Sequence, residues 1–240
     1  MAEKVDILAI GAHPDDVELS AGGTILKSVA QGKKVAIVDL TEGELGSRGT
    51  VRSRYEEAAN AAQILGVEHR ENIRLADGFF TEDRDSLVRL IKAIRHYQPE
   101  IVLANAVEDR HPDHGRGSSF ISRACFLSGL LKIETSRNGE DQEKWRPKVV
   151  YHYIQDRYIK PDIIIDVSEF REKKMDAILA YETQFYKEGA KGPKTPISGK
   201  DFIAFLEARM RQVGRDIGAE FGEGFTVERP IGVDDLTTLI

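Results

Sequence analysis

Short apolar runs alternate with amphipathic segments through the first half of the chain. The runs are rich in Ile, Val and Leu and are followed by polar or glycine-containing residues, which is typical of buried parallel strands. They cover residues 5–10, 34–40, 72–75 and 101–104. The segments between them have helical spacing and stop near Gly or Pro, at residues 24–31, 52–65 and 86–97. This order predicts a Rossmann-like three-layer α/β fold with a mostly parallel sheet and helices on both faces.

The second half of the chain is less regular. Residues 149–154 and 163–167 have the pattern of strands, and residues 169–186 and 201–217 have that of helices. Between these helices, residues 187–200 contain five glycines and prolines, which predicts a mobile surface loop. With 240 residues and 41% hydrophobic side chains, the chain fits a single domain over residues 1–240.

Charge and apolar-run length limit the partners of this protein. The 40 acidic and 34 basic residues are interspersed and give a net charge of -6, so no broad basic face is expected for nucleic acid. No apolar run approaches the roughly 20 residues that span a bilayer, and the N-terminus lacks a signal-peptide pattern. We therefore expect a cytoplasmic protein without a membrane partner. Its single cysteine, Cys125, cannot form an internal disulfide and is expected in the core.

The tripeptide His-Pro-Asp occurs twice, in Ala12-His13-Pro14-Asp15-Asp16 and in Asp109-Arg110-His111-Pro112-Asp113-His114. Composition alone predicts about 0.015 copies in a chain of this length. Both copies follow the carboxyl end of a predicted parallel strand, where open α/β sheets build their ligand sites. A single copy would usually be a turn with a solvated histidine, but two copies at strand ends favour a functional site.

The two motifs carry the residues of a catalytic metal site. A tight His-Pro-Asp turn can bring His13 and Asp16 together, and His114 from the second turn completes a set of two imidazoles and one carboxylate. Such a set leaves a coordination position open for water. Asp15 is then free to act as general base on that water. His111 could stabilise an oxyanion or deliver a proton to a leaving amine, with Asp113 orienting its ring. The constellation fits amide hydrolysis.

Other polar features have alternative interpretations. Gly22-Gly23 and residues 42–49 could form a phosphate cradle for a nucleotide, but neither matches a dinucleotide or P-loop motif, and Glu42 and Glu44 would repel phosphate. We interpret these glycines as shaping a substrate-facing loop. The histidines without acidic neighbours at ligand spacing are expected to be surface or structural residues: His69, His96 and His152.

The motifs resemble those of the zinc-dependent N-acetylglucosamine deacetylase superfamily called LmbE-like or PIG-L-like. The likeness includes the two His-Pro-Asp clusters with Glu18 and Gly22-Gly23-Thr24. It extends through residues 40–44 and to Gly49, Arg54, Glu57-Ala58 and Ala61-Ala62. It implies a Rossmann-like fold in which His13, Asp16 and His114 bind zinc. Asp15 would be the general base, and His111, with Asp113 behind it, the oxyanion-stabilising or acid histidine. Val17 stands where the family often has Glu, and Glu18 follows one position later.

Within this superfamily the chain is similar to the bacillithiol-pathway deacetylases, which act on N-acetylglucosaminyl malate. The similar segments are residues 108–110, 180–185, 194–196 and 217–225. Malate carries two carboxylates, and the guanidinium groups of Arg54 and Arg110 are the candidate substrate-binding groups. Arg54 could instead form an ordinary helix-surface pair with Glu56 or Glu57. The likeness also implies a homo-oligomer, such as a hexamer.

Several alternatives stay open from the sequence. Other N-acetylglucosamine conjugates or thiol conjugates share the same motifs, and a two-His, one-carboxylate site also suits Fe(II). A nucleotide-dependent sugar transferase would need phosphate-binding glycines that the chain does not show. A non-catalytic metal or sugar sensor would not need a base such as Asp15.

Overall fold

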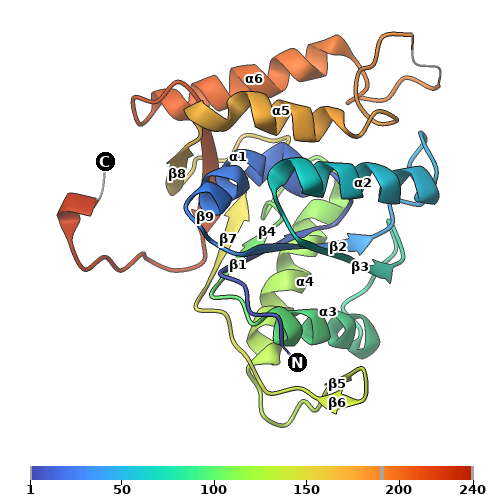
Figure 1. Ribbon diagram of the computed structural model, residues 1–240, viewed down its shortest axis with the longest axis vertical. Helices are drawn as coiled ribbons and strands as arrows, with labels where there is room; N and C mark the ends of the chain where they lie inside the picture. The colour runs from blue at the N-terminus through green and yellow to red at the C-terminus, as the bar shows by residue number, and fades with distance from the viewer. Residues whose placement is uncertain (1, 190–191, 239–240) are drawn as a thin grey trace.

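The computed structural model describes residues 2–189 and 192–238, which form a seven-stranded sheet flanked by helices (Figure 1). The sheet strands are β1 (Ile7–Gly11), β2 (Val35–Thr41), β3 (His69–Leu75), β4 (Ile101–Ala104), β7 (Val149–Tyr153), β8 (Ile163–Asp166) and β9 (Gly222–Val227). The α-helices are α1 (Asp16–Ala30), α2 (Val51–Leu65), α3 (Arg84–Tyr97), α4 (Pro112–Ser128), α5 (Arg171–Leu179) and α6 (Lys200–Arg215). A small hairpin of β5 (Ser136–Arg137) and β6 (Glu140–Asp141) and two short 3-10 turns, at Ser168–Phe170 and Leu236–Thr238, complete these elements.

The strands lie in the order β3-β2-β1-β4-β7-β9-β8. The pairs from β3 to β7 are parallel, whereas β9 runs antiparallel to both β7 and β8. The chain builds β1, β2 and β3 outward and then returns to place β4 on the other side of β1. This reversal makes the carboxyl ends of β1 and β4 the topological switch point, which is where doubly wound sheets bind ligands.

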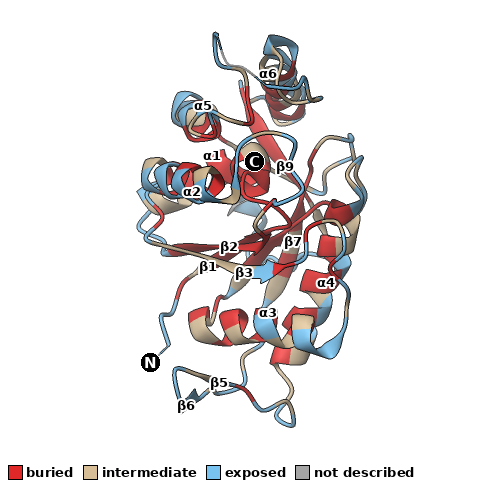
Figure 2. Ribbon diagram, turned by 90° about the vertical axis from the view of Figure 1, so that its right-hand side faces the viewer, coloured by how far each residue is buried: buried red, intermediate tan, exposed pale blue. Residues whose placement is uncertain are grey.

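Alternation along β1 explains the two main cores. Leu8 and Ile10 point to the layer that contains α3 and α4, while Ile7 and Ala9 point to the layer that contains α1 and α2. Both sets are buried, so the strand is apolar on both faces (Figure 2). The predicted three-layer fold with helices on both faces of a mostly parallel sheet is confirmed.

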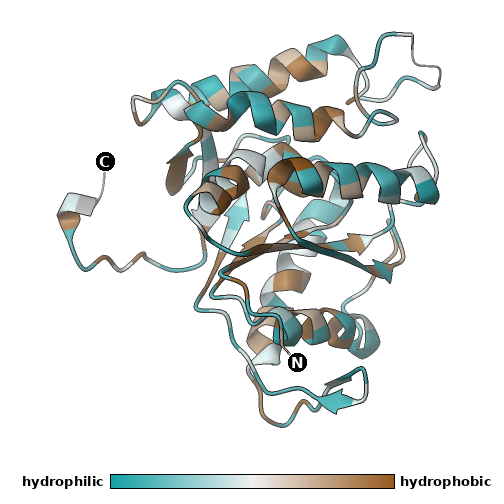
Figure 3. Cartoon of the chain, viewed as in Figure 1, coloured by the Kyte–Doolittle hydropathy of each residue, from teal (hydrophilic) through white to brown (hydrophobic). Residues whose placement is uncertain are grey.

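A third core joins α2, α5 and α6 outside the main layers. Its buried side chains include Met175, Ile178, Phe202 and Leu206. Hydrophobic and hydrophilic residues alternate along these helices (Figure 3), and the hydrophobic residues of this core are buried. The third core therefore fixes α6 above the carboxyl edge of the sheet, next to the switch point.

Most predicted elements are confirmed, with several corrections. Helix α1 begins at Asp16, so Gly22 and Gly23 lie buried inside a helix and do not shape a loop. The helix expected over residues 169–186 ends at Leu179. Neither α4 nor β9 was expected as an element. Cys125 is buried within α4, as predicted. None of the helices in the described parts of the chain is long and apolar enough to cross a bilayer.

Candidate functional site

The two His-Pro-Asp motifs are helix starts at the switch point. Asp15 is the N-cap of α1 and adopts φ 117°, a left-handed conformation that is rare for residues with a side chain. His111 is the N-cap of α4, and its Nδ1 accepts a hydrogen bond from the backbone N–H of Asp113 (3.3 Å). Pro112 suits the first helical position because it lacks an N–H. Each motif therefore places its histidine in the loop between a strand and a helix.

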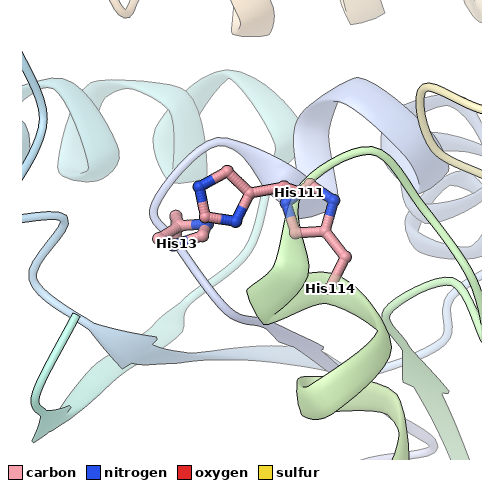
Figure 4. Close-up of side chains that lie close together, drawn as sticks. All are labelled: His13, His111 and His114. Atoms are coloured by element: carbon pink, nitrogen blue, oxygen red, sulfur yellow. The ribbon is translucent and has the colours of Figure 1, made fainter. Parts of the chain in front are cut away.

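The three motif histidines gather at one place (Figure 4). Ring centroids are separated by 4.7 Å between His13 and His111, 5.0 Å between His111 and His114, and 5.6 Å between His13 and His114. Asp16 lies against two of them. Its Oδ1 is 3.1 Å from His114 Nε2, and its Oδ2 is 3.6 Å from His13 Nδ1. The predicted ligands His13, Asp16 and His114 are thus brought together.

The carboxylate of Asp16 is held firmly. It accepts hydrogen bonds from the backbone N–H of His13 (3.0 Å), from Asn105 Nδ2 (3.0 Å) and from Gln155 Nε2 (3.1 Å). Burial alone would raise the pKa of Asp16, but His114 and His13 outweigh burial and keep that pKa well below its usual range. Asp16 is therefore an anion, the form that binds a metal.

Two further carboxylates orient the imidazoles. Asp77 Oδ1 lies 3.0 Å from His13 Nε2, and Asp109 hydrogen-bonds His114 Nδ1. Burial opposes protonation of His114, yet the charge of Asp16 and the bond to Asp109 raise its pKa to about 9. Carboxylates of this kind fix the tautomer of metal-binding histidines. Neither residue was predicted to have a role, although Asp109 stands at the start of the second motif and Asp77 follows β3.

Asp15 points away from this cluster toward Arg54. The Arg54 Nη1 to Asp15 Oδ2 distance is 3.0 Å, and both side chains are buried. Burial raises the pKa of Asp15 to about 6, although the Arg54 charge acts in the opposite direction. The surface pair of Arg54 with Glu56 or Glu57 is therefore wrong. The carboxylate of Glu57 accepts hydrogen bonds from Thr183 instead.

His111 and Asp113 depart from the expected arrangement. The carboxylate of Asp113 accepts hydrogen bonds from the backbone of Gly78 (2.8 Å) and from Arg116 (3.1 Å), and only the Asp113 backbone contacts His111. Burial, together with His13 and His114, lowers the pKa of His111. A neutral His111 whose Nδ1 accepts a hydrogen bond carries its proton on Nε2. His111 can therefore donate a hydrogen bond while uncharged.

The donor set fits a divalent transition metal. Ligand atoms of His13, His111 and His114 lie within 4.8 Å of one another, as do those of His13, Asp77 and Asp113. Asp16 contacts His13 at 3.6 Å and His114 at 3.1 Å, so it adds a carboxylate to the imidazoles of this cluster. Imidazole nitrogen with carboxylate oxygen is a combination that suits zinc and Fe(II).

A cavity of about 360 Å³ opens beside these residues. Of residues 42–49, which were predicted to face substrate, Gly43, Leu45, Gly46 and Ser47 contribute to its wall. Gly43 has φ 63°, and a Cβ there would stand 2.8 Å from Arg54 Nη2, so glycine lets this loop approach the guanidinium. The opposite wall comes from residues 195–197 and from α6.

The other predicted groups lie as follows. Arg110 lines the cavity and pairs with Asp156 (2.8 Å). The predicted loop 187–200 contributes Thr195, Pro196 and Ile197 to the cavity, while its residues 190–191 lie outside the described residues. Glu18 is buried and accepts hydrogen bonds from Arg70 and Tyr181, which places it in the packing between α1 and its neighbours.

The remaining histidines are structural or partly exposed, as expected. His152 is buried and contacts Ser118 and Glu228, while His69 and His96 both lie near Glu3. Their acidic partners are distant in sequence, so spacing along the chain could not reveal them. None of the three lines the cavity described above.

Known proteins match this chain over the same motifs. The family model described as GlcNAc-PI de-N-acetylase (PIG-L) matches residues 8–125, which include both His-Pro-Asp motifs. A diacetylchitobiose deacetylase from Thermococcus kodakarensis is 30% identical over 191 residues, or 75% of this chain and 70% of that protein. A 4-oxalmesaconate hydratase from Pseudomonas putida is 28% identical over 186 residues, or 71% of this chain and 70% of that protein.

The fold is shared with a solved structure. The conserved protein TT1542 from Thermus thermophilus superposes with a TM-score of 0.84 and 31% sequence identity. The alignment covers 97% of this chain and 98% of that one. The similarity therefore extends beyond the motifs to α5, α6 and β9, of which α6 contributes residues to the cavity wall.

Proposed function

Because the chain belongs to the GlcNAc-PI de-N-acetylase (PIG-L) family of deacetylases, we propose that it hydrolyses the N-acetyl group of an N-acetylglucosamine conjugate. The favoured substrate is N-acetylglucosaminyl malate, which would give glucosaminyl malate and acetate in bacillithiol biosynthesis. The observation that supports the proposal is that Asp15 pairs with Arg54 and not with the histidines. Asp15 sits beside Asp16 but binds Arg54, so a carboxylate is available as a base next to a set of metal-binding groups.

Zinc is the metal that we assign to His13, Asp16 and His114, with Fe(II) as the alternative. The choice is supported by the nitrogen and oxygen donors and by the carboxylates that orient both imidazoles. When bound there, a zinc ion supplies Lewis-acid polarisation of the acetyl carbonyl and lowers the pKa of water.

Asp15 and His111 perform the proton transfers in this proposal. Asp15 accepts a proton from the attacking water as the oxygen adds to the acetyl carbon. His111 donates a hydrogen bond from Nε2 to the oxygen that becomes negative. The C–N bond then breaks, and the proton held by Asp15 passes to the amine that leaves. The immediate products are acetic acid and the free amine, and transfer of the acid proton to the amine gives acetate and an ammonium group, so atoms and charges balance.

Arginines at the cavity wall would recognise the aglycone. Arg110 is partly exposed and lies beside the cavity, where its guanidinium can reach a carboxylate. Arg54 contributes a second guanidinium, whose buried Nε has no hydrogen-bond partner among the described residues. Malate carries carboxylates that a guanidinium can bind, which makes Arg54 and Arg110 candidate substrate-binding groups.

The wider setting follows the same likeness. We propose one domain over residues 1–240, a cytoplasmic location, and a homo-oligomer such as a hexamer. A small-molecule sugar conjugate is the expected partner, without nucleic acid or membrane. The interspersed 40 acidic and 34 basic residues support the exclusion of nucleic acid, because they provide no broad basic face.

The test is a substrate panel with an Asp15→Asn variant and Asp216→Asn as matched control. Asparagine tolerates the positive φ of residue 15 and removes only the base. We expect metal-loaded protein to release acetate fastest from N-acetylglucosaminyl malate, compared with N,N′-diacetylchitobiose and with an N-acetylglucosaminyl inositol conjugate. Asp15→Asn should lower kcat by roughly 10²–10⁴ with metal content unchanged, while the exposed Asp216→Asn keeps full activity.

Three results would point elsewhere. Faster release from diacetylchitobiose or the inositol conjugate would move the substrate to another sugar. Hydration of an unsaturated dicarboxylate without acetate release would favour chemistry like that of the hydratase relative. Tight binding of a nucleotide sugar by metal-free protein would favour a transferase.

A further inference from the structure

Arg209 on α6 lines the cavity but has no acidic partner of its own. Its guanidinium lies over the ring of Phe205, at 5.4 Å from the centroid, and no hydrogen bond or ion pair joins it to the residues that the structure describes. Burial lowers the pKa of Arg209 below its ordinary value. Arginine stays charged in proteins even so, and a partly buried cation without a partner is costly.

The carboxylates near Arg209 are already paired with other cations. Asp156, Asp109 and Glu223 are the acids whose charges act on Arg209 through space. Asp156 binds Arg110 at 2.8 Å, and Glu223 binds Lys174 at 2.6 Å. Asp109 is bound to His114. Arg209 is therefore left with a positive charge that no neighbouring carboxylate contacts.

Ser20 marks the same part of the cavity. Ser20 and Arg209 both line the main cavity and a smaller one behind it. Ser20 Oγ is buried and has no hydrogen-bond partner among the described residues, so its hydrogen-bonding capacity is unused within the protein. It follows Asp16 by four residues and so lies on the same face of α1, about one turn or ~5.4 Å further along. This position is close to the metal-binding residues but separate from them.

We propose that Arg209, supported by Ser20, forms an oxyanion subsite that selects substrates with an anionic aglycone. The subsite deepens the proposed deacetylation and rests on it. The acetamido group would occupy the end of the cavity at Asp16, and a substituent on the adjacent anomeric carbon would extend along α1 toward Arg209. A carboxylate or phosphate on that substituent would give the guanidinium the partner that the protein does not supply.

Kinetics with matched substrates tests the subsite. The variants are Arg209→Met, which keeps length and contact with Phe205, and Arg209→Lys, which keeps charge. Arg211→Met is the control, since Arg211 lies on the same helix and pairs with Glu220. The substrates are N-acetylglucosaminyl malate, N-acetylglucosamine 1-phosphate and the neutral methyl N-acetylglucosaminide.

Arg209→Met should raise KM for the anionic substrates by roughly tenfold or more, with kcat and the neutral substrate within about twofold. Arg209→Lys should recover part of the loss. The anionic substrate whose KM rises more shows whether the subsite binds a carboxylate or a phosphate. An equal rise in KM for neutral and anionic substrates would mean that Arg209 has only a packing role. Unchanged KM values would contradict the proposed subsite.

Calorimetry separates this subsite from the proposed reaction. Binding of glucosaminyl malate and of methyl glucosaminide to metal-loaded protein needs no turnover. Tighter binding of the anionic compound that disappears in Arg209→Met supports the subsite even if no acetate is released. Equal binding of the two compounds would overturn the subsite while leaving an active deacetylase in place.

Discussion

Asp15 combines an ion pair with an unusual backbone conformation. Its φ of 117° directs the side chain away from Asp16 and toward Arg54. Strained residues of this kind cluster at functional sites, where the surrounding structure holds them in place. The conformation gives the two adjacent aspartates different partners. Asp16 contacts His13 and His114, whereas Asp15 pairs with Arg54.

The ion pair predicts how activity depends on pH. Asp15 acts as a base only when ionised, so activity should rise with pH through its pKa, which burial raises to about 6. Arg54 lowers this pKa, and Arg54→Met should therefore move the acid limb of the kcat profile to higher pH. A bound divalent cation also lowers the pKa of Asp15, in the wild type and in Arg54→Met alike. The acid limb of the variant is therefore still expected at higher pH than that of the wild type.

The matched control for this profile is Arg52→Met. Arg52 stands two residues earlier on α2 and forms an exposed pair with Glu56. Its substitution should leave the acid limb in place. An acid limb at the same pH in Arg54→Met and the wild type would mean that Asp15 does not set the profile.

Single residues were predictable to different degrees. The repeated His-Pro-Asp tripeptide was enough to predict that His13, Asp16 and His114 lie close together, because strand ends at a switch point meet in space. Asp77 was missed, since it follows β3 without a motif and approaches His13 only after folding. Arg209 was missed because a lone arginine on an amphipathic helix has no sequence signal. Arg209 differs from other arginines only in the folded protein, where the carboxylates near it are paired with other cations.

Helix α1 shows how tertiary packing overrides local signals. Gly22-Gly23 suggested a loop, but both residues lie in the middle of the helix, where glycine is unfavourable by about 1 kcal/mol relative to alanine. The reason is close packing. A Cβ on Gly23 would stand 2.7 Å from Val167 Cβ, beside β8, so only glycine lets α1 approach this strand.

The two glycines should respond differently to alanine. Gly23→Ala should destabilise the protein by roughly 1–3 kcal/mol, because the added methyl group meets Val167 and must displace it. Gly22→Ala places its methyl group 3.3 Å from the flexible Lys174 side chain, and the gain in helix propensity offsets that contact. Urea denaturation of the pair gives the comparison. Equal stabilities for the two variants would contradict the packing argument.

At the scale of the whole molecule, the sheet order depends on contacts that local patterns do not contain. The parallel half was predictable because its strands are apolar and separated by helices with clear stops. Strand β9 was not, since Gly222–Val227 contains two glycines and a glutamate. It forms only because β7 and β8 offer antiparallel edges on both sides. Long-range pairing of this kind also brings Glu223 to Lys174, which pair at 2.6 Å.

The central claim is that a metal held by His13, Asp16 and His114 is required for hydrolysis of an N-acetyl group. The most direct measurement is acetate release from N-acetylglucosaminyl malate by chelated protein and by the same protein reloaded with zinc. We expect one free amine per acetate, loss of release on chelation and its return with zinc. Metal uptake without acetate release from this substrate or from other N-acetylglucosamine conjugates, or equal release by chelated protein, would contradict the claim.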